Sequence, residues 1–502
     1  MKKLSLLLTM VLPLLIAAQE IAPDITIEKK RLLILPSAGG DDIESIDSKV
    51  TAIVAGEATA LGRFEVIDRN NLKAIMDEQA LQLTGIINDS DVIAIGKVAA
   101  APEALIVTIF NFGQKGVPPE EDEEEDEKDR KEARKAGLLG IIAREVVDAA
   151  VDKAMEDVER YPNNIQTTLQ GEVRKIDLES GQSLASFSIS VEHTGGNKSA
   201  SLSKALNQVS WRVSQQLREL YLLTSQVVDV RGREVILLLG RNMGLKKGTL
   251  FAINTPDNRR TIGGREITVP GRQVGFLEVL ELSQDANRGR ILRKWEPIEP
   301  GYTAIEATGG IMAAGIGLKY GSQSPDLGLD FIAYFAPLRK FGGSAFFGLG
   351  TLVDSRDDTD FNLSFGGDIY FRLINTIPFS LAGSMSLPVN VAFRSDDADE
   401  SHTVTSLVFS PVIGGRAEIM LNAKMDLIVS AGYCLTSNHS AWKYTVSDDD
   451  DDEEDVTYPA EWDDRGAPDF DTKGLYFNIG IRFLMFNVGA GMPSLSDLPD
   501  FR

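Results

Sequence analysis

The residues most able to do acid–base, nucleophilic or metal chemistry are three histidines and one cysteine. His193, His402 and His439 stand far apart in the sequence and lack the spacing of zinc ligands. Cys434 is a lone thiol, which excludes an internal disulfide, and it falls on the polar side of an alternating segment, where it is interpreted as a small packed residue. No Gly-x-Ser-x-Gly segment supplies a nucleophile elbow. We therefore predict a protein that is not an enzyme, with no catalytic residue, cofactor or resident metal.

Carboxylates are concentrated in two runs. Residues 118–132 hold 10 acids and 3 bases, and residues 448–464 hold 11 acids and no base, so these runs supply −18 of the formal net charge of −23. Acid runs in loops lack the unequal environments that separate a general acid from a general base, so we predict solvated segments. The alternative for residues 448–464 is weak binding of calcium or magnesium, which prefer oxygen ligands. The rest of the chain is nearly balanced and has no basic face, which argues against nucleic acid as a partner.

Further charged residues recur on one side of alternating segments in the last third of the chain. From Phe379 to Phe393 the odd positions are mostly large and apolar and the even positions are mostly small or polar, and residues 361–372, 423–435 and 475–485 repeat the pattern. A period of two predicts strands with one apolar and one polar face. The charged residues on the polar face are Asp330, Asp368, Arg372, Arg394, Arg416, Glu418, Lys424, Asp426 and Arg482.

These segments, with weaker ones near 309–320, 327–337, 342–353 and 404–419, predict eight antiparallel strands over residues 307–486. A soluble sandwich would alternate in the same way, but strands of ten or more residues are long enough to cross a bilayer. Long polar connections such as 395–403 and 437–473 also alternate with short ones near 337–340, 374–376 and 421–422, as in outer-membrane barrels. We predict an eight-stranded transmembrane β-barrel in outer-membrane lipid, followed by a tail over residues 487–502.

The interior of such a barrel decides what it can do. Eight strands enclose a lumen that side chains fill, so the barrel should anchor and not conduct. Unpaired charges there would be very unfavourable, and because both signs are present, we predict that the nine charged residues form a salt-bridge network that plugs the barrel. An even number of strands places both barrel ends on the periplasmic side.

The N-terminus predicts export. Lys2 and Lys3 precede an apolar run from Leu4 to Ile16 that ends in two alanines, which is the order of a secretory signal peptide over residues 1–18, with a linker over 19–30. No cysteine follows the run, so a lipid anchor is not expected at this point. We predict a bacterial outer-membrane protein whose N-terminal domains lie in the periplasm.

Residues 31–222 alternate strand and helix patterns. Apolar strands are expected near 32–35, 64–67 and 104–110, helices over 44–61 and 202–223, and a hairpin over 170–178 and 184–191. Strands separated by helices predict an α/β domain. Its acidic insertion, residues 118–135, is predicted to stay solvated.

Within this domain, one run of residues and five later pieces resemble the signature of the CsgG family of bacterial envelope proteins, which includes the curli secretion channel and has the activator LpoB as a relative. The run is Gly62-Arg63-Phe64-Glu65-Val66-Ile67-Asp68-Arg69, and the later pieces are Leu72, Glu78-Gln79, Leu81-Gln82, Thr84-Gly85 and Ile95-Gly96-Lys97. The residues that carry the resemblance are Arg63, Phe64, Asp68, Arg69, Glu78, Gln79, Gly85, Gly96 and Lys97. The resemblance implies that the domain binds and positions other envelope proteins. In the curli channel each subunit adds two hairpins to a shared pore, whereas the corresponding residues here, near 113–165 and 192–200, do not alternate over membrane length.

Residues 223–306 are strand-rich and predict a small all-β domain, a barrel. The string Val230-Arg231-Gly232-Arg233 and the later Gly244-Leu245-Lys246-Lys247-Gly248 resemble the C-terminal domain of the flagellar assembly protein FlgT. These glycines lack the Gly-Lys-Ser/Thr ending of a phosphate loop and are interpreted as turn glycines.

Together these features predict a multidomain, non-enzymatic outer-membrane protein. Its barrel would hold a CsgG-like domain and a FlgT-like domain at the membrane, where they bind envelope proteins in the assembly or secretion of a surface structure. The alternative is one subunit of a homo-oligomeric, curli-type secretion channel, which requires a ring with a conducting pore.

Overall fold

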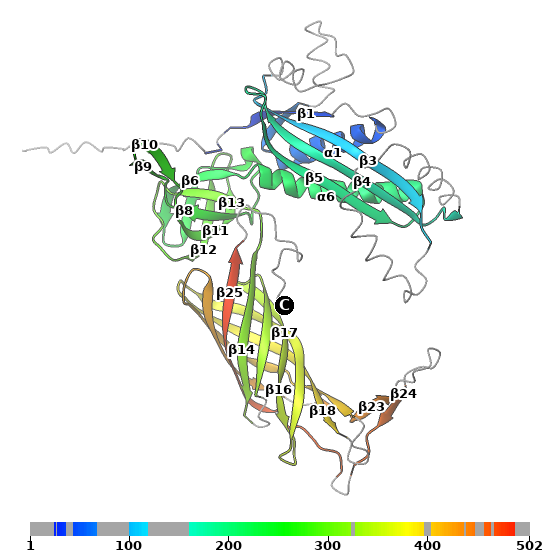
Figure 1. Cartoon of the computed structure of the whole chain (residues 1–502). Coiled ribbons are helices and arrows are strands. Elements are labelled where there is room, and N and C mark those ends of the chain that lie inside the picture. Colours follow the sequence, from blue (N-terminus) through cyan, green and yellow to red (C-terminus); the bar gives the residue numbers. More distant parts are fainter. Residues whose placement is uncertain are drawn as a thin grey trace, which may run out of the picture.

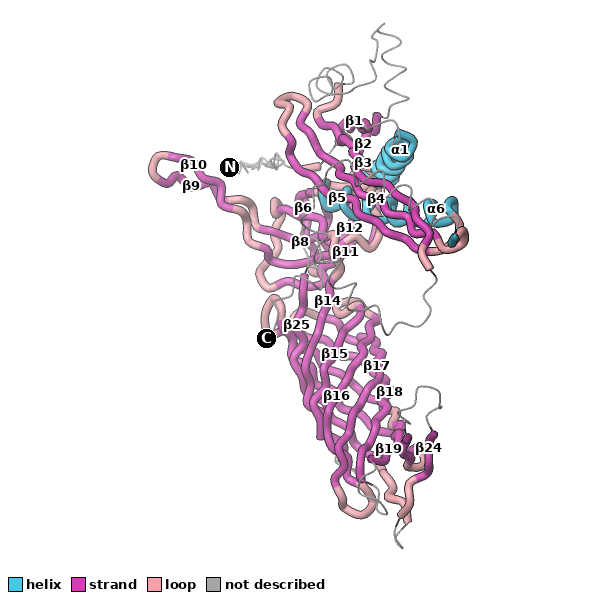
Figure 2. The backbone as a smooth tube through the Cα atoms, turned by 45° about the vertical axis from the view of Figure 1, so that its right-hand side comes forward, coloured by secondary structure: helices cyan, strands magenta, loops and turns pink. Residues whose placement is uncertain are grey.

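The computed structural model describes residues 25–26, 28–36, 44–67, 100–118, 160–322, 327–395, 403–435, 438–446, 456–462 and 466–486. This part of the chain is mostly β-structure with two α-helices. It forms a sheet covered by helices, a closed six-stranded barrel and a longer, closed eight-stranded barrel, with the smaller barrel in the middle (Figures 1 and 2). Neither of the two helices is long and apolar enough to span a membrane.

Several sequence predictions concern residues outside the described part. They are the signal peptide 1–18, most of the linker 19–30, nearly all of the insertion 118–135, the acids 448–455 and 463–464, the tail 487–502, His402, and the motif residues Asp68, Arg69, Glu78, Gln79, Gly85, Gly96 and Lys97.

The N-terminal unit is a mixed sheet with two helices. Its elements are β1 (Lys30–Pro36), α1 (Glu44–Leu61), β2 (Phe64–Ile67), β3 (Glu103–Gly116), β4 (Ile165–Asp177), β5 (Ser183–Thr194) and α6 (Lys198–Leu220). The strand order is β2-β1-β3-β4-β5, and β1 runs parallel to both β2 and β3. Asn197 caps the N-terminus of α6, since its side chain accepts a hydrogen bond of 3.0 Å from the amide of Ala200. Residues 195–197 therefore connect β5 directly to α6, and no second hairpin lies between them.

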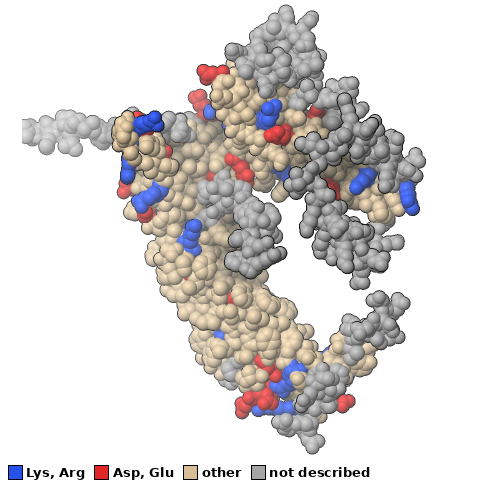
Figure 3. All heavy atoms as spheres, viewed as in Figure 1, with Lys and Arg blue, Asp and Glu red and all other residues tan. Residues whose placement is uncertain are grey.

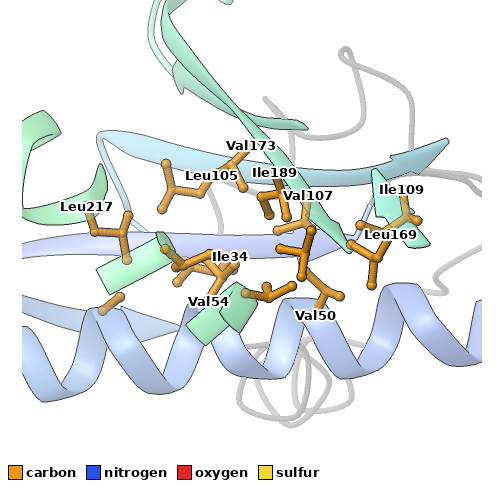
Figure 4. Packing of buried hydrophobic residues seen from close by; sticks show 14 of the residues in the cluster. Ile34, Val50, Val54, Leu105, Val107, Ile109, Leu169, Val173, Ile189 and Leu217 are labelled. Carbon is orange, nitrogen blue, oxygen red and sulfur yellow. The ribbon is translucent and has the colours of Figure 1, made fainter. Parts of the chain in front are cut away.

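Both helices pack on one face of this sheet (Figure 4). Val50 and Val54 of α1 and Val209 and Val213 of α6 are fully buried against the central strands, with Ile34 of β1 among their neighbours. Burial of each such side chain contributes about 1.5 to 3 kcal/mol. Helix α1 and strand β1 lie where the helical spacing in residues 44–61 and the apolar run 32–35 predict them.

The six-stranded barrel closes in the order β11-β12-β7-β6-β13-β8. Its strands are β6 (Thr224–Arg231), β7 (Glu234–Leu237), β8 (Leu250–Asn254), β11 (Gln273–Leu282), β12 (Asn287–Lys294) and β13 (Thr303–Ala307). This confirms the small barrel predicted from the sequence. A hairpin of β9 (Asn258–Ile262) and β10 (Arg265–Val269) projects from it, and all ten of its strand residues are exposed (Figure 2).

The eight-stranded barrel closes through a pairing of β17 with β18. Its strands are β14 (Ile311–Gly321), β15 (Leu327–Phe335), β16 (Phe341–Val353), β17 (Thr359–Asn375), β18 (Phe379–Ser395), the consecutive β19 (Thr403–Phe409) and β20 (Val412–Met420), β21 (Met425–Cys434) and β25 (Gly474–Phe486). The predicted count of eight is confirmed when β19 and β20 are taken as one interrupted strand.

Two prolines explain the interruption between β19 and β20. Residues 389–395 of β18 pair with β19, and residues 379–386 pair with β20. Pro388 and Pro411 have no amide hydrogen to donate, so the ladder cannot continue between the two segments. The amide of Ser410 donates instead to the Pro388 carbonyl at 3.2 Å.

Beyond the barrel wall, β22 (Asn438–His439) and β23 (Lys443–Val446) pair with β19, and β24 (Val456–Pro459) pairs with β23. These strands cover an aromatic cluster in which Trp442 is buried against Phe470, with ring centroids 5.6 Å apart. This hairpin extends the end of the barrel that lies away from the six-stranded barrel (Figure 1).

Candidate functional site: the charged interior of the eight-stranded barrel

The two ends of the eight-stranded barrel differ in their connections. Three short turns, residues 336–340, 376–378 and 421–424, lie at the end next to the six-stranded barrel, which we call the proximal end. At the opposite, distal end β14 ends at Gly321 and β15 begins at Leu327, β16 ends at Val353 and β17 begins at Thr359, β18 ends at Ser395 and β19 begins at Thr403, and β21 ends at Cys434 and β25 begins at Gly474. The strand β14 starts and β25 finishes at the proximal end, because the two strands pair from Ile311–Phe486 to Gly321–Tyr476.

Glu418 is the centre of the charge cluster inside the barrel. Its carboxylate lies 2.7 Å from Arg372 Nη2, 3.1 Å from Arg482 Nη2 and 3.2 Å from Arg416 Nε. The Ser380 hydroxyl donates to the same carboxylate at 3.2 Å. All four ionic side chains are buried, so each charge depends on these partners in place of water.

Asp426 links this cluster to the six-stranded barrel. One of its oxygens lies 2.7 Å from Arg482 Nη2, and the other lies 2.7 Å from Nη1 of Arg293, a residue of β12. Arg293 also donates from Nε to the Ala423 carbonyl at 2.8 Å and from Nη2 to the Met425 carbonyl at 3.1 Å. Burial lowers the pKa of the Arg293 guanidinium, and the charge of Asp426 opposes that shift.

Two further groups of charges lie toward the distal end. Lys319 Nζ donates to Ser364 Oγ at 2.6 Å and lies 3.6 Å from Asp330 Oδ1. At the distal rim Arg394 makes contacts of 2.7 Å with Asp354 and 2.8 Å with Asp360. Asp368 belongs to neither group. It is half-buried and accepts a hydrogen bond of 2.9 Å from Ser344 Oγ.

The charges that point into the described barrel balance only when Arg293 is included. The barrel's own cations are Lys319, Arg372, Arg394, Arg416 and Arg482, and its carboxylates are Asp330, Asp354, Asp360, Asp368, Glu418 and Asp426. Five cations against six carboxylates leave one negative charge, and Arg293 supplies the sixth cation through the proximal end. A neutral set of paired charges is the condition under which a low-dielectric interior tolerates ions.

Eight of the nine charged residues predicted for the lumen lie on its inner side, and Lys424 is the exception. Five of the eight form the single cluster around Glu418 and Asp426. The other three have separate partners, Asp330 with Lys319, Arg394 with Asp354 and Asp360, and Asp368 with Ser344. Lys424 is exposed in the turn before β21, and its amide donates to Asn422 Oδ1 at 2.9 Å. A tight turn takes a residue out of the pleated alternation on which the prediction rested. Sequence reasoning missed Lys319, Asp354, Asp360 and Arg293. Lys319 occupies a polar position in an alternating segment, whereas no signal in residues 287–294 marks Arg293.

The rest of the lumen is filled by side chains. Arg416 lies over the rings of Tyr370 and Tyr334, with its guanidinium carbon 4.4 and 5.0 Å from their centroids. Among the described residues, Arg416 Nη2 has no hydrogen-bond partner, so these ring faces provide part of its stabilisation. Two cavities between inward side chains have volumes of about 40 and 30 Å³, enough for isolated waters.

The six-stranded barrel contacts all three proximal turns. Arg339 in the first turn lies 2.9 Å from Glu278 of β11. Arg233 donates to the Asn375 carbonyl just before the second turn. Arg293 holds the third turn, as described above. The six-stranded barrel thus contacts the proximal end of the eight-stranded barrel at three points around the rim of the larger barrel.

Of the described residues that carry the CsgG resemblance, Arg63 and Phe64 lie at the other junction of the molecule. Arg63 Nη2 lies 2.6 Å from Glu306 of β13, and Arg218 Nε of α6 lies 2.8 Å from the same carboxylate. The ring of Phe64 packs against Tyr221, with centroids 4.5 Å apart. Arg63 therefore joins the N-terminal unit to the six-stranded barrel.

The residues considered for chemistry at the outset do not form a site within the described part of the chain. His439 Nδ1 lies 3.0 Å from Asp469, a partner that the sequence did not indicate, and His193 lies in β5. Cys434 is buried, with its sulfur 3.8 Å from the Thr472 hydroxyl. In the described part of the chain, no group of three or more His, Cys, Asp or Glu has the arrangement of a metal site.

Comparison with known proteins gives little overall likeness. No family model matches the chain. No curated protein matches it either. Among solved structures, a major outer membrane protein from Thermus thermophilus is 13% identical with a TM-score of 0.24, over 35% of this chain and 100% of that one. Lipoprotein GNA1162 from Neisseria meningitidis is 13% identical with a TM-score of 0.21, over 38% of this chain and 97% of that one. The CsgG and FlgT resemblances therefore stay predictions.

Proposed function

We propose that the protein is a non-enzymatic anchor of the bacterial outer membrane. The eight-stranded barrel would span the membrane, and the six-stranded barrel and the N-terminal unit would lie in the periplasm, where they bind and position other envelope proteins. The observation that carries the proposal is the outer surface of the eight-stranded barrel.

That surface is apolar over a height that fits a membrane. Most of the exposed large hydrophobic side chains in the described residues lie on this barrel. The face of its wall seen in Figure 3 carries few charges between the two ends of the barrel. Exposed Phe361 and Phe371 lie ten residues apart on β17, a separation of about 33 Å along the strand and about 25 Å across a membrane at a tilt of about 40°. A soluble protein rarely exposes an apolar surface of this extent.

Aromatic side chains mark both edges of this band. Tyr320 and Phe477 are neighbours on β14 and β25 toward the distal end, at an edge where Phe361 also lies. Phe335, Phe341, Phe371 and Phe379 are exposed near the proximal end. Aromatic girdles at both interfaces are typical of outer-membrane barrels. The short turns and both barrel termini at the proximal end favour a periplasmic position for that end.

An anchoring role follows from the filled lumen and the seated smaller barrel. The network around Glu418 occupies the proximal half of the lumen, and Arg293 closes its proximal end. The exposed hairpin β9–β10 offers a contact surface to a partner, since Ile262, Ile267 and Val269 are exposed beside Arg260 and Arg265. This arrangement favours protein binding over transport through the barrel.

A charge on the lipid-facing wall tests the membrane assignment. Phe365 is exposed on β17 midway between the two aromatic edges. Phe365→Arg is expected to destabilise the inserted barrel by about 2 to 4 kcal/mol, the cost of an arginine near the middle of the bilayer. The measurement is unfolding in lipid vesicles by the gel shift between folded and heated barrel. Thr359→Arg, at an exposed position distal to the band, is the matched control. Equal stability of the two variants would contradict a membrane-spanning wall.

Conductance separates the anchor from the secretion-channel alternative. We expect the purified protein to give monomers by mass photometry and no steady current in planar bilayers, because side chains fill the described lumen and the cavities noted above have volumes of only about 40 and 30 Å³. A stable ring with reproducible conductance would instead support an oligomeric channel subunit.

A further inference from the structure

Apart from the lumen of the eight-stranded barrel, a cavity lined by charged residues lies between the N-terminal unit and the six-stranded barrel. Its volume is about 330 Å³, which falls within the range of small-molecule sites. One wall comes from Leu61 and Arg63 beside α1 and from residues 214–218 of α6, and the opposite wall comes from the loop 244–249 of the smaller barrel. The cavity is therefore built by two units of the protein.

The lining of this cavity has an excess of positive charge. Its cations are Arg63, Arg218, Lys246 and Lys247, and its only carboxylate among the described lining residues is Glu306. Both oxygens of Glu306 are already used, one by Arg218 at 2.8 Å and the other by Arg63 at 2.6 Å. Four cations against one acid leave three positive charges in a protein whose formal net charge is −23.

Arg63 also has an unused donor. Its side chain is 5% exposed, and among the described residues its Nε has no hydrogen-bond partner, while its other two nitrogens contact the Tyr221 carbonyl and Glu306. A buried guanidinium N–H without an acceptor is energetically unfavourable. Burial lowers the pKa of Arg63, and the like charge of Arg218 adds to that shift. An anion in the cavity would offset the repulsion between Arg63 and Arg218.

We propose that this cavity binds a phosphate-type anion, carried by a phosphorylated glycan or by a lipid headgroup. A group with two or more negative charges matches the excess of three better than a single carboxylate does. Arginine forks and lysine ammonium groups are the usual side-chain ligands of phosphate. The donors differ from those of a phosphate loop, because they are side chains from two units and not the amides of one glycine-rich turn. Binding would bridge α6 and the loop 244–249 and so fix the two units together.

Titration of the full chain in detergent micelles with inorganic pyrophosphate tests the proposal. Lys246→Gln/Lys247→Gln is expected to weaken binding by about tenfold or more, since it removes two charge-assisted contacts. Both lysines are exposed, so the variant should keep its fold, which thermal unfolding checks. Lys198→Gln/Lys204→Gln removes the same charge from exposed positions of α6 outside the cavity and should leave the affinity unchanged. All titrations are made at one ionic strength by calorimetry.

Two further probes identify the source of the phosphate. Glucose 1-phosphate binding that depends on Lys246 and Lys247 supports a phosphorylated glycan. Binding confined to short-chain phosphatidic acid, with the same dependence, supports a lipid headgroup. The proposal is overturned if pyrophosphate does not bind at millimolar concentration, or if the two lysine double variants bind it equally well.

Discussion

Replacing Glu418 with glutamine is expected to lower the free energy of unfolding of the eight-stranded barrel by about 3 to 5 kcal/mol. The carboxylate is the common partner of Arg372, Arg416 and Arg482, all of which are buried. Removing its charge leaves like charges close together without water to solvate them, and the amide that replaces it would direct its NH₂ group toward arginine donors. Denaturant unfolding in micelles, followed by the gel shift of the barrel, measures the loss.

Two companion variants make this test specific. Asp358→Asn changes an acid in the exposed distal connection and should alter stability by less than about 1 kcal/mol. Arg372→Met combined with Glu418→Gln removes one cation of the cluster together with its partner, so the double variant should be more stable than the sum of the single effects implies. Two results would show that the cluster does not hold the barrel together. Either Glu418→Gln is as stable as the wild type, or the loss of unfolding free energy in the double variant equals the sum of the losses in the two single variants.

The strands of the eight-stranded barrel could be predicted from sequence because each carries its own signal. An apolar outer face and a polar inner face impose a period of two on every strand, and Phe379 to Phe393 shows this period over most of β18. The break between β19 and β20 was not predicted. It depends on Pro388 in one strand lying beside Pro411 in the next, and only the register reveals that neighbourhood.

The sequence predicts most of the charged residues that face the lumen, but it does not predict which of them contact each other. Alternation placed Asp426 and Arg482 on the inner face, and they are direct neighbours in the register of β21 and β25. The contact of Glu418 with Arg372 joins β20 to β17, which are not adjacent strands, so it depends on how the barrel closes. Lys424 shows the converse error, because a residue in a turn no longer follows the alternation of its strand.

Arg293 could not have been found from the sequence, since its role depends on the docking of one barrel on another. Residues 287–294 read as a strand with several basic residues, of which Arg288 is half-exposed and pairs on the surface with Glu281. Only the three contacts between the six-stranded barrel and the proximal turns select Arg293 as the residue that enters the lumen.

Arg293→Met is expected to release the third proximal turn from the six-stranded barrel and to lower the free energy of unfolding by about 3 kcal/mol. The variant removes the sixth cation of the lumen and leaves Asp426 with Arg482 alone. It also removes the donors to the carbonyls of Asn422, Ala423 and Met425, so the amides of residues 421–426 should exchange with solvent faster. Hydrogen exchange followed by mass spectrometry measures this effect. Arg288→Met, on the same strand with surface partners, is the matched control and should change exchange little.

Arg293→Lys distinguishes the two contributions of this side chain. Lysine restores the missing positive charge beside Asp426, but its single nitrogen cannot reach all the acceptors that the guanidinium contacts. We therefore expect Arg293→Lys to recover most of the unfolding free energy and little of the protection of residues 421–426. If Arg293→Met exchanged at these residues as slowly as the wild type, the six-stranded barrel would be held by Arg339 and Arg233 alone, and the lumen would tolerate an unbalanced carboxylate. That outcome would remove the physical basis for treating the smaller barrel as the closure of the larger one.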